Sequence, residues 1–438
     1  MVKQPVLLMI LLMSILLLSG CGSSEAPSGT IVTNQVILEK ATGKYQEMRH
    51  IVLKGTNQDI GAAIAKISRE QYQAQSIPFP TIQDKLNRNS YIQQFFPYLA
   101  ERQRGVESYY GWGSSDLNDS SALWYEIFPV NCSAVFFPKS VTSTGRSFMA
   151  RDMDFYTVDI NQFIGRKESP LLNKLFSRNF ILETYPENGG YAAMVVGTFD
   201  LMNGAYDGFN EQGLVISGLV DQSLTSTKGG VVLDLTKLSV QSGLNYVQMV
   251  RLLLENAATI DEVDDLLTDL TVYFPLDGIH FLIGDRSGNS AILEFYIPIP
   301  GDPASKMTYT LIRQPSTTPA IMTNHSMRLY PDPSQYQDKY KKTESYNTFY
   351  RYMRLYEYLQ ASAFIKYTLD DGLYAMSLVY GYADDASEGA AAPFPVRTIW
   401  SVAMDIDDLS MKIKFYTADN TVQKQPILTD AYTFKLRR

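Results

Sequence analysis

Short apolar runs bounded by turn residues make up much of the chain, and a few segments repeat their apolar positions at helical spacing. Runs of the first kind indicate strands, and the helical spacing indicates amphipathic helices. The predicted helices are residues 59–72, 91–110, 244–258, 259–270 and 345–360, with Pro97 a break in the second. The predicted strands lie within residues 32–53, 134–137, 147–153, 180–185, 191–199, 214–220, 279–284, 290–296, 309–313, 320–323, 398–404 and 409–416. Strands, a helical pair and further strands predict a layered α+β fold.

One predicted hairpin combines apolar strands with polar groups that can do chemistry. Its first strand begins beside Cys132, a turn-rich stretch follows, and the returning strand carries Arg151 and precedes Asp154. The hairpin therefore brings a thiol, a guanidinium and a carboxylate to one end of a sheet. A neighbouring arginine lowers the pKa of a thiol and raises its thiolate fraction. The hairpin is a candidate nucleophile site.

The N-terminus has the pattern of a targeting segment. Lys3 precedes a nearly uninterrupted apolar run from Val6 to Leu18, which has the length of a signal-peptide core. The run ends in Leu-Ser-Gly-Cys21, which resembles a bacterial lipobox. The resemblance implies that residues 1–20 are removed and that lipid on Cys21 anchors an extracytoplasmic protein to a bacterial membrane. An ordinary secretory signal is the alternative.

Charge and motifs exclude several function classes. The 438 residues carry a net charge of −8, with an isoelectric point near 5.1 and no run rich in Lys and Arg. The sequence therefore predicts no nucleic-acid partner. It contains no phosphate-binding loop, dinucleotide fingerprint, His-Glu-x-x-His or Cys-x-x-Cys motif. We accordingly expect no cofactor and no metal.

The counts of cysteine and histidine narrow the possible nucleophiles. If Cys21 carries lipid, Cys132 is the only remaining thiol, and no intramolecular disulfide can form. Such a thiol in an exported protein is either buried and inert or kept for chemistry. The three histidines are His50, His280 and His325. A Cys–His hydrolase would need one of the last two beside the thiol.

The segment Asn131-Cys132-Ser133, followed by Arg151 and Asp154, resembles the start of the catalytic chain in N-terminal-nucleophile cysteine hydrolases. This superfamily contains choloylglycine hydrolases, penicillin V acylases, acid ceramidases and acyl-CoA:6-aminopenicillanate acyltransferases. The long stretch ahead of the cysteine is most similar to the acyltransferase and ceramidase branch. Further segments similar to the family follow in the family's order at residues 207–214, 280–294, 322–325, 345–352 and the closing hairpin at Trp400.

This resemblance implies a four-layer αββα sandwich, with two stacked, mainly antiparallel sheets between helix layers. It also implies a precursor that cleaves itself between Asn131 and Cys132. Residues 21–35 would be a lipidated tether, residues 36–131 a pro-segment, and residues 132–438 the catalytic segment. The two products would stay associated, because the pro-segment has the pattern of a folded chain.

The resemblance further implies a role for each site residue. Cys132 would attack a linear amide of a small N-acyl compound and form a thioester, using its own freed α-amine as the base. Asp154 would orient that α-amine, and Arg151 would favour the thiolate. Asn324 would donate to the oxyanion, and Arg351 would be the distal arginine of the site. The sequence does not define the acyl group or the amine of the substrate. It also does not define whether water or an amine accepts the acyl group.

Several residue roles, and the function itself, have competing interpretations. Asp152 could take the role given to Asp154, and Arg328 could take the role given to Arg351. Asn210 is expected to be structural. Residues 220–222 depart from the family pattern, which leaves the second oxyanion donor undefined. The competing functions are an unprocessed Cys–His hydrolase and a non-catalytic envelope binding lipoprotein on a degenerate hydrolase fold.

Overall fold

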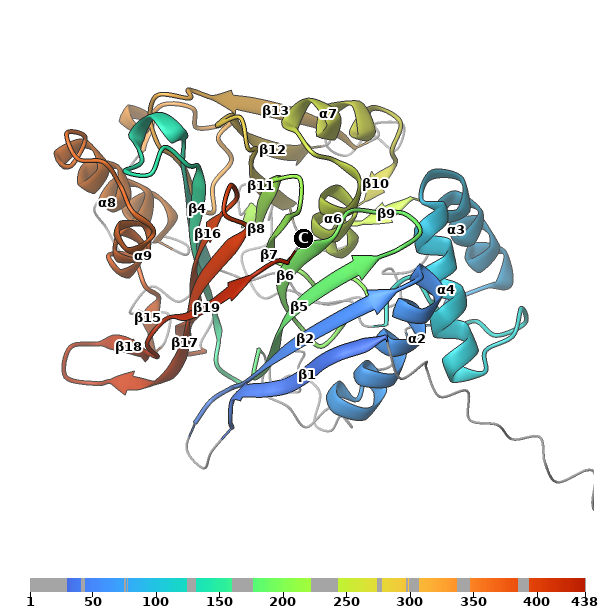
Figure 1. The fold of residues 1–438 in the computed structure, drawn as a ribbon. Coiled ribbons are helices and arrows are strands. Elements are labelled where there is room, and N and C mark those ends of the chain that lie inside the picture. The colour runs from blue at the N-terminus through green and yellow to red at the C-terminus, as the bar shows by residue number, and fades with distance from the viewer. Residues whose placement is uncertain are drawn as a thin grey trace, which may run out of the picture.

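Two stacked sheets lie between two groups of helices, which is the four-layer αββα arrangement (Figure 1). The predicted α+β fold class is therefore confirmed. No helix in the described part of the chain is long and apolar enough to cross a membrane. The predicted signal peptide and Cys21 lie outside the described residues. The computed structural model describes residues 30–40, 44–74, 76, 78–123, 131–159, 176–221, 243–273, 278–296, 298, 307–336, 347–384 and 394–437.

One sheet has nine strands and is antiparallel except where β2 pairs with β5. Long antiparallel hairpins build its second half, and the hairpin of β11 and β12 matches the sequence prediction. In spatial order the strands are β1 (Ile31–Leu38), β2 (Glu47–Gly55), β5 (Arg178–Pro186), β6 (Ala193–Thr198), β7 (Asp207–Asn210), β8 (Val215–Asp221), β11 (Gly278–Gly284), β12 (Ser290–Tyr296) and β13 (Thr308–Gln314).

The other large sheet has eight strands, all antiparallel, and contains the predicted hairpin with Cys132. Its main path is β14 (Ala320–Met322), β3 (Asn131–Phe137), β4 (Phe148–Tyr156), β16 (Val396–Asp405), β17 (Ser410–Asn420) and β18 (Gln425–Leu428). Two short strands attach beside this path, β15 (Tyr382–Ala383) on β16 and β19 (Tyr432–Lys435) on β17. A separate parallel pair joins β9 (Leu244–Asn245) and β10 (Val272–Tyr273).

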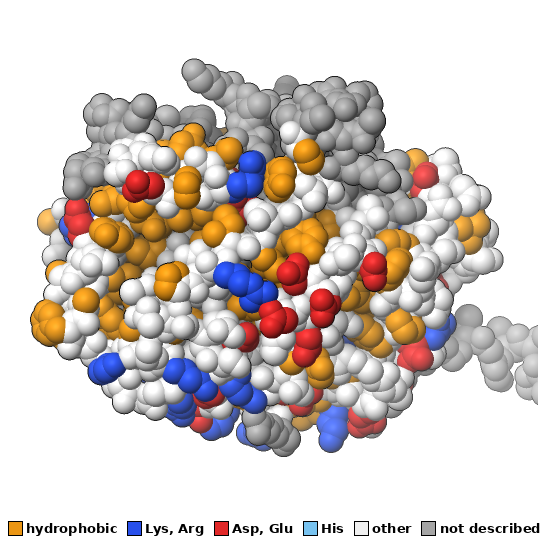
Figure 2. Space-filling model, turned by 90° about the horizontal axis from the view of Figure 1, so that it is seen from above, with side chains coloured by type: hydrophobic (Ala, Val, Ile, Leu, Met, Phe, Trp, Pro, Cys, Tyr) orange, Lys and Arg blue, Asp and Glu red, His pale blue; other side chains and the backbone are white. Residues whose placement is uncertain are grey.

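The helices cover the outer faces of the two sheets (Figure 1). On the nine-stranded side lie α2 (Asn57–Ile67) and α6 (Tyr246–Asn256), with α3 (Ile82–Phe95), α4 (Pro97–Tyr110) and α7 (Ile260–Thr268) around them. On the eight-stranded side lie α8 (Thr348–Ala361) and α9 (Leu369–Ser377). On the face drawn in Figure 2, basic side chains are scattered among acidic and apolar ones.

The structure confirms one feature of the predicted helices and differs in two others. The helix predicted at residues 91–110 is interrupted at Pro97, as expected, because Pro97 occupies the first turn of α4, but its first part, α3, begins earlier than predicted, at Ile82. The helix α9, whose middle holds Gly372, was not predicted. A Cβ at that position would lie 2.7 Å from the ring of Phe148, so close packing on β4 explains the glycine.

The predicted pro-segment is part of the central architecture. Its strands β1 and β2 form the edge of the nine-stranded sheet, where all nine residues of β2 pair with β5. The sheet begins at Ile31, inside the predicted tether of residues 21–35, so that predicted boundary is wrong. The N-terminal segment therefore contributes strands as well as helices to the fold.

Two glycines let α2 and α4 pack backbone against backbone. A Cβ on Gly61 would lie 1.9 Å from the carbonyl oxygen of Arg102, and a Cβ on Gly105 would lie 1.9 Å from that of Gln58. Neither contact is possible with a side chain present, so the helix crossing depends on glycine at both positions.

The two sheets also meet at a glycine. A Cβ on Gly284 of β11 would lie 2.2 Å from the ring of Phe136 of β3, so this ring fills the space beside the glycine. Side chains alternate along a strand, so Cys132 lies on the same face of β3 as Phe136. The thiol therefore points into the layer between the sheets.

Candidate active site

Strand pairing divides the candidate residues between two faces of the eight-stranded sheet. Cys132 is the second residue of β3 and is fully buried. The register with β4 places Arg151 on the same face as the cysteine side chain. The same register places Asp152 and Asp154 on the opposite face, toward the helices α8 and α9. The hairpin thus brings Cys132, Arg151 and Asp154 to one end of the sheet, as predicted, but the carboxylates of Asp152 and Asp154 lie on the face opposite the thiol.

Arg151 joins the thiol to a buried carboxylate of the other sheet. Its Nη2 donates to Sγ of Cys132 (3.1 Å), and its Nη1 donates to Oδ2 of Asp207 (2.9 Å). The indole Nε1 of Trp400 donates to the same carboxylate oxygen (2.9 Å), and its ring centroid lies 5.5 Å from the guanidinium carbon. These contacts fix the guanidinium against the sulfur. The segments that hold Asp207 and Trp400 resemble the family, but no role was predicted for either residue.

Asn324 and Arg351 hold the backbone of the cysteine. The N–H of Cys132 donates to Oδ1 of Asn324 (2.8 Å), which also accepts from Nη2 of Arg351 (2.6 Å). Nη1 of Arg351 donates to the carbonyl of Cys132 and to the hydroxyl of Ser133 (2.9 Å). The Asn324 amide donates to the carbonyl of Val220 (2.8 Å), so this residue also bridges the two sheets. The peptide group before the cysteine is therefore held in one orientation.

The two aspartates form a buried carboxyl pair. Oδ1 of Asp154 accepts from the Thr398 hydroxyl (2.5 Å) and from the Gly381 N–H (3.2 Å). Its Oδ2 and both oxygens of Asp152 are buried without a hydrogen bond to the described residues. Burial, followed by the charge of its neighbour, raises the pKa of Asp152 well above its ordinary range. Burial also raises the pKa of Asp154, but the charge of Arg351 opposes this. Asp152 is therefore the member that keeps a proton more readily.

Burial dominates the acidity of the thiol. It raises the pKa of Cys132 to about 12, although the charge of Arg151 lowers it as predicted. Asp154 and Asp152 act with burial and raise the pKa further. One arginine does not outweigh the cost of placing a thiolate in this apolar layer. In the uncleaved chain the thiol is therefore neutral at pH 7, and attack requires a base.

The histidines have other neighbours. In His325, Nδ1 lies 2.9 Å from the Thr348 hydroxyl and Nε2 lies 2.9 Å from the Tyr336 hydroxyl. Nδ1 of His280 lies 3.6 Å from Oε1 of Glu294. Within the part of the chain that the structure describes, no hydrogen bond joins either ring to the thiol. This arrangement gives no support to a Cys–His hydrolase.

Arg328 and Asn210 make their contacts elsewhere. The guanidinium of Arg328 lies 4.2 Å from the ring centroid of Tyr296 and the residue is exposed, whereas Arg351 contacts the cysteine. The side chain of Asn210 donates to the carbonyls of Leu254 and Ala257 and so ties the turn after β7 to α6. That contact is the structural role expected for Asn210.

The fold and this arrangement of cysteine, arginines and asparagine define a class of enzymes that cleave or transfer acyl groups at amides. The family model "acyl-coenzyme A:6-aminopenicillanic acid acyl-transferase" matches residues 142–416, which is more than half of the chain. The chain belongs to this family, and it is an amide hydrolase or acyltransferase of the N-terminal-nucleophile superfamily. The match begins after Cys132 and includes Arg151, Asp154, Asn324 and Arg351.

Three solved structures are similar to this one. A mutant of conjugated bile acid hydrolase from Clostridium perfringens has a TM-score of 0.42 and 14% identity, covering 70% of this chain and 97% of that chain. Penicillin V acylase from Agrobacterium tumefaciens has a TM-score of 0.39 and 18% identity, covering 68% and 86%. A second variant of the bile acid hydrolase has a TM-score of 0.38 and 14% identity, covering 71% and 91%. No curated protein sequence matches the chain.

Proposed function

We propose that the chain is a cysteine amidohydrolase or acyltransferase that acts on the linear amide of small N-acyl compounds. Its nucleophile is Cys132, and cleavage between Asn131 and Cys132 activates it. One observation carries the proposal: three polar groups converge on a single buried cysteine. Arg151 contacts its sulfur, Asn324 accepts from its N–H, and Arg351 donates to its carbonyl.

Maturation follows from the position of the sulfur next to the preceding peptide bond. Sγ of Cys132 loses its proton and attacks the carbonyl carbon of Asn131. The C–N bond breaks as the nitrogen gains a proton, which leaves a thioester and a free α-amine. Water then hydrolyses the thioester to a new carboxylate and a thiol. A proton acceptor is needed because the pKa of the thiol is about 12, and Asp154, which pairs in register with Asn131 on the opposite face of the sheet from the thiol, is our candidate.

Turnover uses the new α-amine as the base. An α-amino group has a pKa of about 8, so it can take the thiol proton near neutral pH. The thiolate attacks the substrate amide, the amine leaves with a proton, and water or a second amine resolves the thioester. Oδ2 of Asp154, which has no hydrogen bond among the described residues, is available to accept from the α-amine. The Asn324 amide carries a second hydrogen for the oxyanion, a contact worth about 3 kcal/mol in other enzymes.

The decisive experiment is intact mass and N-terminal sequencing of the soluble form, residues 22 onward, beside Cys132→Ala. We expect the wild type to yield a chain that starts at Cys132, and the variant to stay whole. Screening of the cleaved form should begin with N-acyl amides, with acylation of Cys132 followed by peptide mass. A folded wild type that stays whole would contradict the proposed activation.

We also propose that the chain is lipid-anchored outside the cytoplasm through Cys21. The proposal is supported by the lipobox-like sequence that ends at this cysteine. In a bacterial host, the wild type should fractionate with membranes and incorporate a labelled fatty acid. Cys21→Ser should lose the label and the membrane association. A variant that keeps both would contradict the anchor.

A further inference from the structure

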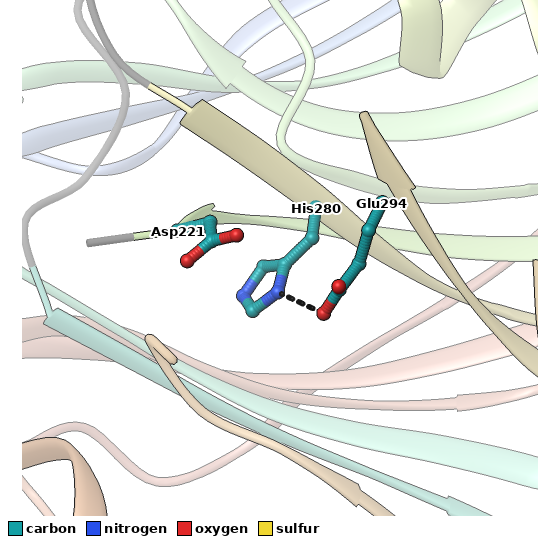
Figure 3. A group of neighbouring side chains, drawn as sticks. All are labelled: Asp221, His280 and Glu294. Atoms are coloured by element: carbon teal, nitrogen blue, oxygen red, sulfur yellow. Dashed lines mark ion pairs between the residues drawn. The ribbon is translucent and has the colours of Figure 1, made fainter. Parts of the chain in front are cut away.

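Three side chains that can bind metals lie together on the inner face of the nine-stranded sheet. Asp221 ends β8, His280 lies in β11 and Glu294 lies in β12. His280 is opposite Glu294 in one strand pair and opposite Leu219, two residues before Asp221, in the next. This register puts all three on one face. Their ligand atoms lie within 4.8 Å of one another, and the imidazole lies between the two carboxylates (Figure 3).

The imidazole is the unusual member of this cluster. His280 is fully buried, and neither of its ring nitrogens makes a hydrogen bond to the described residues. Nδ1 faces Oε1 of Glu294 at 3.6 Å, which is longer than a hydrogen bond, and buried polar groups in folded proteins nearly always have a closer partner, so this ring lacks one. A neutral imidazole offers one lone pair, which is what a metal ion binds. Glu294 and Asp221 are also buried, and a divalent cation would balance their two negative charges.

We propose that Asp221, His280 and Glu294 form a binding site for a divalent transition metal, with Zn²⁺ the best match. One imidazole nitrogen and two carboxylate oxygens are ligands that zinc accepts, whereas Mg²⁺ and Ca²⁺ take oxygen ligands. Zinc binds these atoms at about 2.0–2.2 Å, so the three side chains must close in by about 1 Å. The soft terminal torsions of Asp221 and His280 can supply that shift, whereas Glu294 is held in place by hydrogen bonds.

The position of the site suggests what the metal does. Glu294 accepts hydrogen bonds from the Ser326 hydroxyl (2.7 Å) and from the N–H groups of Met327 (2.6 Å) and Arg328 (3.1 Å). The residue before Asp221 supplies the carbonyl that accepts from the Asn324 amide. The metal would therefore fasten three strands where they hold the segment that carries Asn324. This positioning effect rests on the proposed function, but metal binding itself does not.

The test is a zinc titration of the purified full chain in detergent, followed by calorimetry, in the Cys132→Ala background. That background removes the Cys132 thiol as a competing ligand and blocks the proposed cleavage. Failure of the metal site can therefore be distinguished from failure of the proposed Cys132 chemistry. We expect one Zn²⁺ per chain, and His280→Ala should weaken binding about 100-fold or more. The matched control is His50→Ala, because His50 also lies beside a carboxylate, Glu183 (2.7 Å), but outside the cluster. It should bind zinc like the parent.

A second variant guards against loss of fold. If circular dichroism shows that His280→Ala does not fold, Asp221→Asn takes its place in the test. Its side chain has nearly the same shape as that of the parent, and the substitution should weaken zinc binding. Co²⁺ should give visible d–d bands that both substitutions abolish. Parent and variants that bind zinc equally, or a folded parent that binds no stoichiometric metal, would overturn the proposal. Either result would favour a protonated His280 held between two carboxylates.

Discussion

At the scale of single residues, the candidate site depends on which arginine faces the cysteine. Arg351 is buried, and its planar guanidinium binds the Cys132 carbonyl, the Ser133 hydroxyl and Asn324 together. Lysine cannot reproduce that geometry, because its ammonium is a point charge on a flexible stem. The fork of Arg351 therefore sets the orientation of the nucleophile.

We predict that Arg351→Lys lowers the rate of acylation by N-acyl amides about 100-fold, the size of effect that misplacement of a reacting group produces. The matched control is Arg328→Lys, which changes an exposed arginine and should stay within about twofold of the wild type. Single-turnover acylation of Cys132, measured by mass spectrometry, checks both. Equal losses in the two variants would contradict the assignment of Arg351.

His325 provides a pH-dependent prediction. Burial lowers its pKa from an ordinary value of 6.5 to about 3. As the pH falls below 6.5, His325 binds a proton in the unfolded chain but stays neutral in the folded chain. The contribution of His325 to stability is therefore fully present above pH 6.5 and is lost as the pH falls toward 3. The loss contributed by this residue is at most about 1.4 kcal/mol per pH unit.

We expect His325→Phe to flatten the pH dependence of stability below pH 6.5. Its ring can keep the tilted contact with the Phe349 ring (centroids 4.5 Å apart), while the hydrogen bonds to Thr348 and Tyr336 are lost. The variant should thus be less stable at pH 7 but have a shallower slope. Urea unfolding of the Cys132→Ala chain between pH 4.5 and about pH 7.5 measures both. An unchanged slope would show that His325 does not titrate in this way.

The contact that was predicted from spacing lies within one hairpin, whereas the contacts that were missed join strands far apart in the sequence. Arg151 could be placed beside Cys132 because a hairpin returns at a known register. Asp207 and Trp400 reach Arg151 from strands far along the chain, and neither position follows from spacing. The cluster at Asp221 was missed for the same reason, because its three ligands come from three strands with no sequence motif. The thiol pKa could not be foreseen either, since burial decides it.

At the scale of elements, the packing of α2 on α4 is set by two glycines. Each helix places a backbone carbonyl where the other would carry a Cβ. The contact is unusually close, and it joins α4 to α2, which lies against β2 and β5. Helix propensity alone would favour alanine at both positions, so the glycines are there for packing.

We predict that Gly61→Ala destabilises the chain by about 1–3 kcal/mol, because the added methyl group forces the helices apart. Gly113→Ala is the control, since a Cβ there would meet only the Asp116 carboxylate, at 3.6 Å. Its effect should stay within about 0.5 kcal/mol. Urea unfolding of both variants in the Cys132→Ala chain provides the comparison. Equal stabilities would mean that the close crossing is absent in solution.

The elements with strong local patterns were predicted, and those that depend on context were not. The helix at α7 was expected from its Thr-Ile-Asp-Glu start, and Thr259 indeed accepts from the Glu262 N–H. The break at Pro97 was expected because proline favours a helix start over a helix interior. The short helix α9 was missed, since Gly372 weakens its pattern and only packing on β4 explains that glycine.

At the scale of the whole molecule, a buried ionic triad joins the predicted pro-segment to the predicted catalytic segment. Nη1 of Arg102 on α4 donates to both carboxylate oxygens of Glu255 (2.8 and 3.0 Å), and Arg251 donates to one of them (2.8 Å). Burial would raise the pKa of Glu255, but the two arginines hold it below its ordinary range. Together with the pairing of β2 and β5, the triad supports the proposal that the two products stay associated.

We predict that the cleaved products of the wild type co-elute in size-exclusion chromatography, and that Arg102→Met separates them at a lower urea concentration. Removing one partner of a buried ion pair costs about 3–5 kcal/mol. The control is Arg104→Met on the same helix, whose side chain is half exposed and pairs loosely with Glu101 (3.7 Å). That exposed pair contributes at most about 1 kcal/mol. Equal urea midpoints for the two variants would contradict the role of the triad.

The parallel pairing of β2 with β5 has a kinetic consequence. In the precursor both strands belong to one chain, so they meet in a first-order step. After the proposed cleavage they belong to two chains, and a denatured enzyme must rebuild this edge of the sheet by diffusional encounter. Renaturation yield of the matured form should then rise with protein concentration, while that of the uncut Cys132→Ala chain should not. Maturation would thus convert a chain that refolds alone into two chains, and refolding after denaturation would depend on the concentration of the other cleavage product.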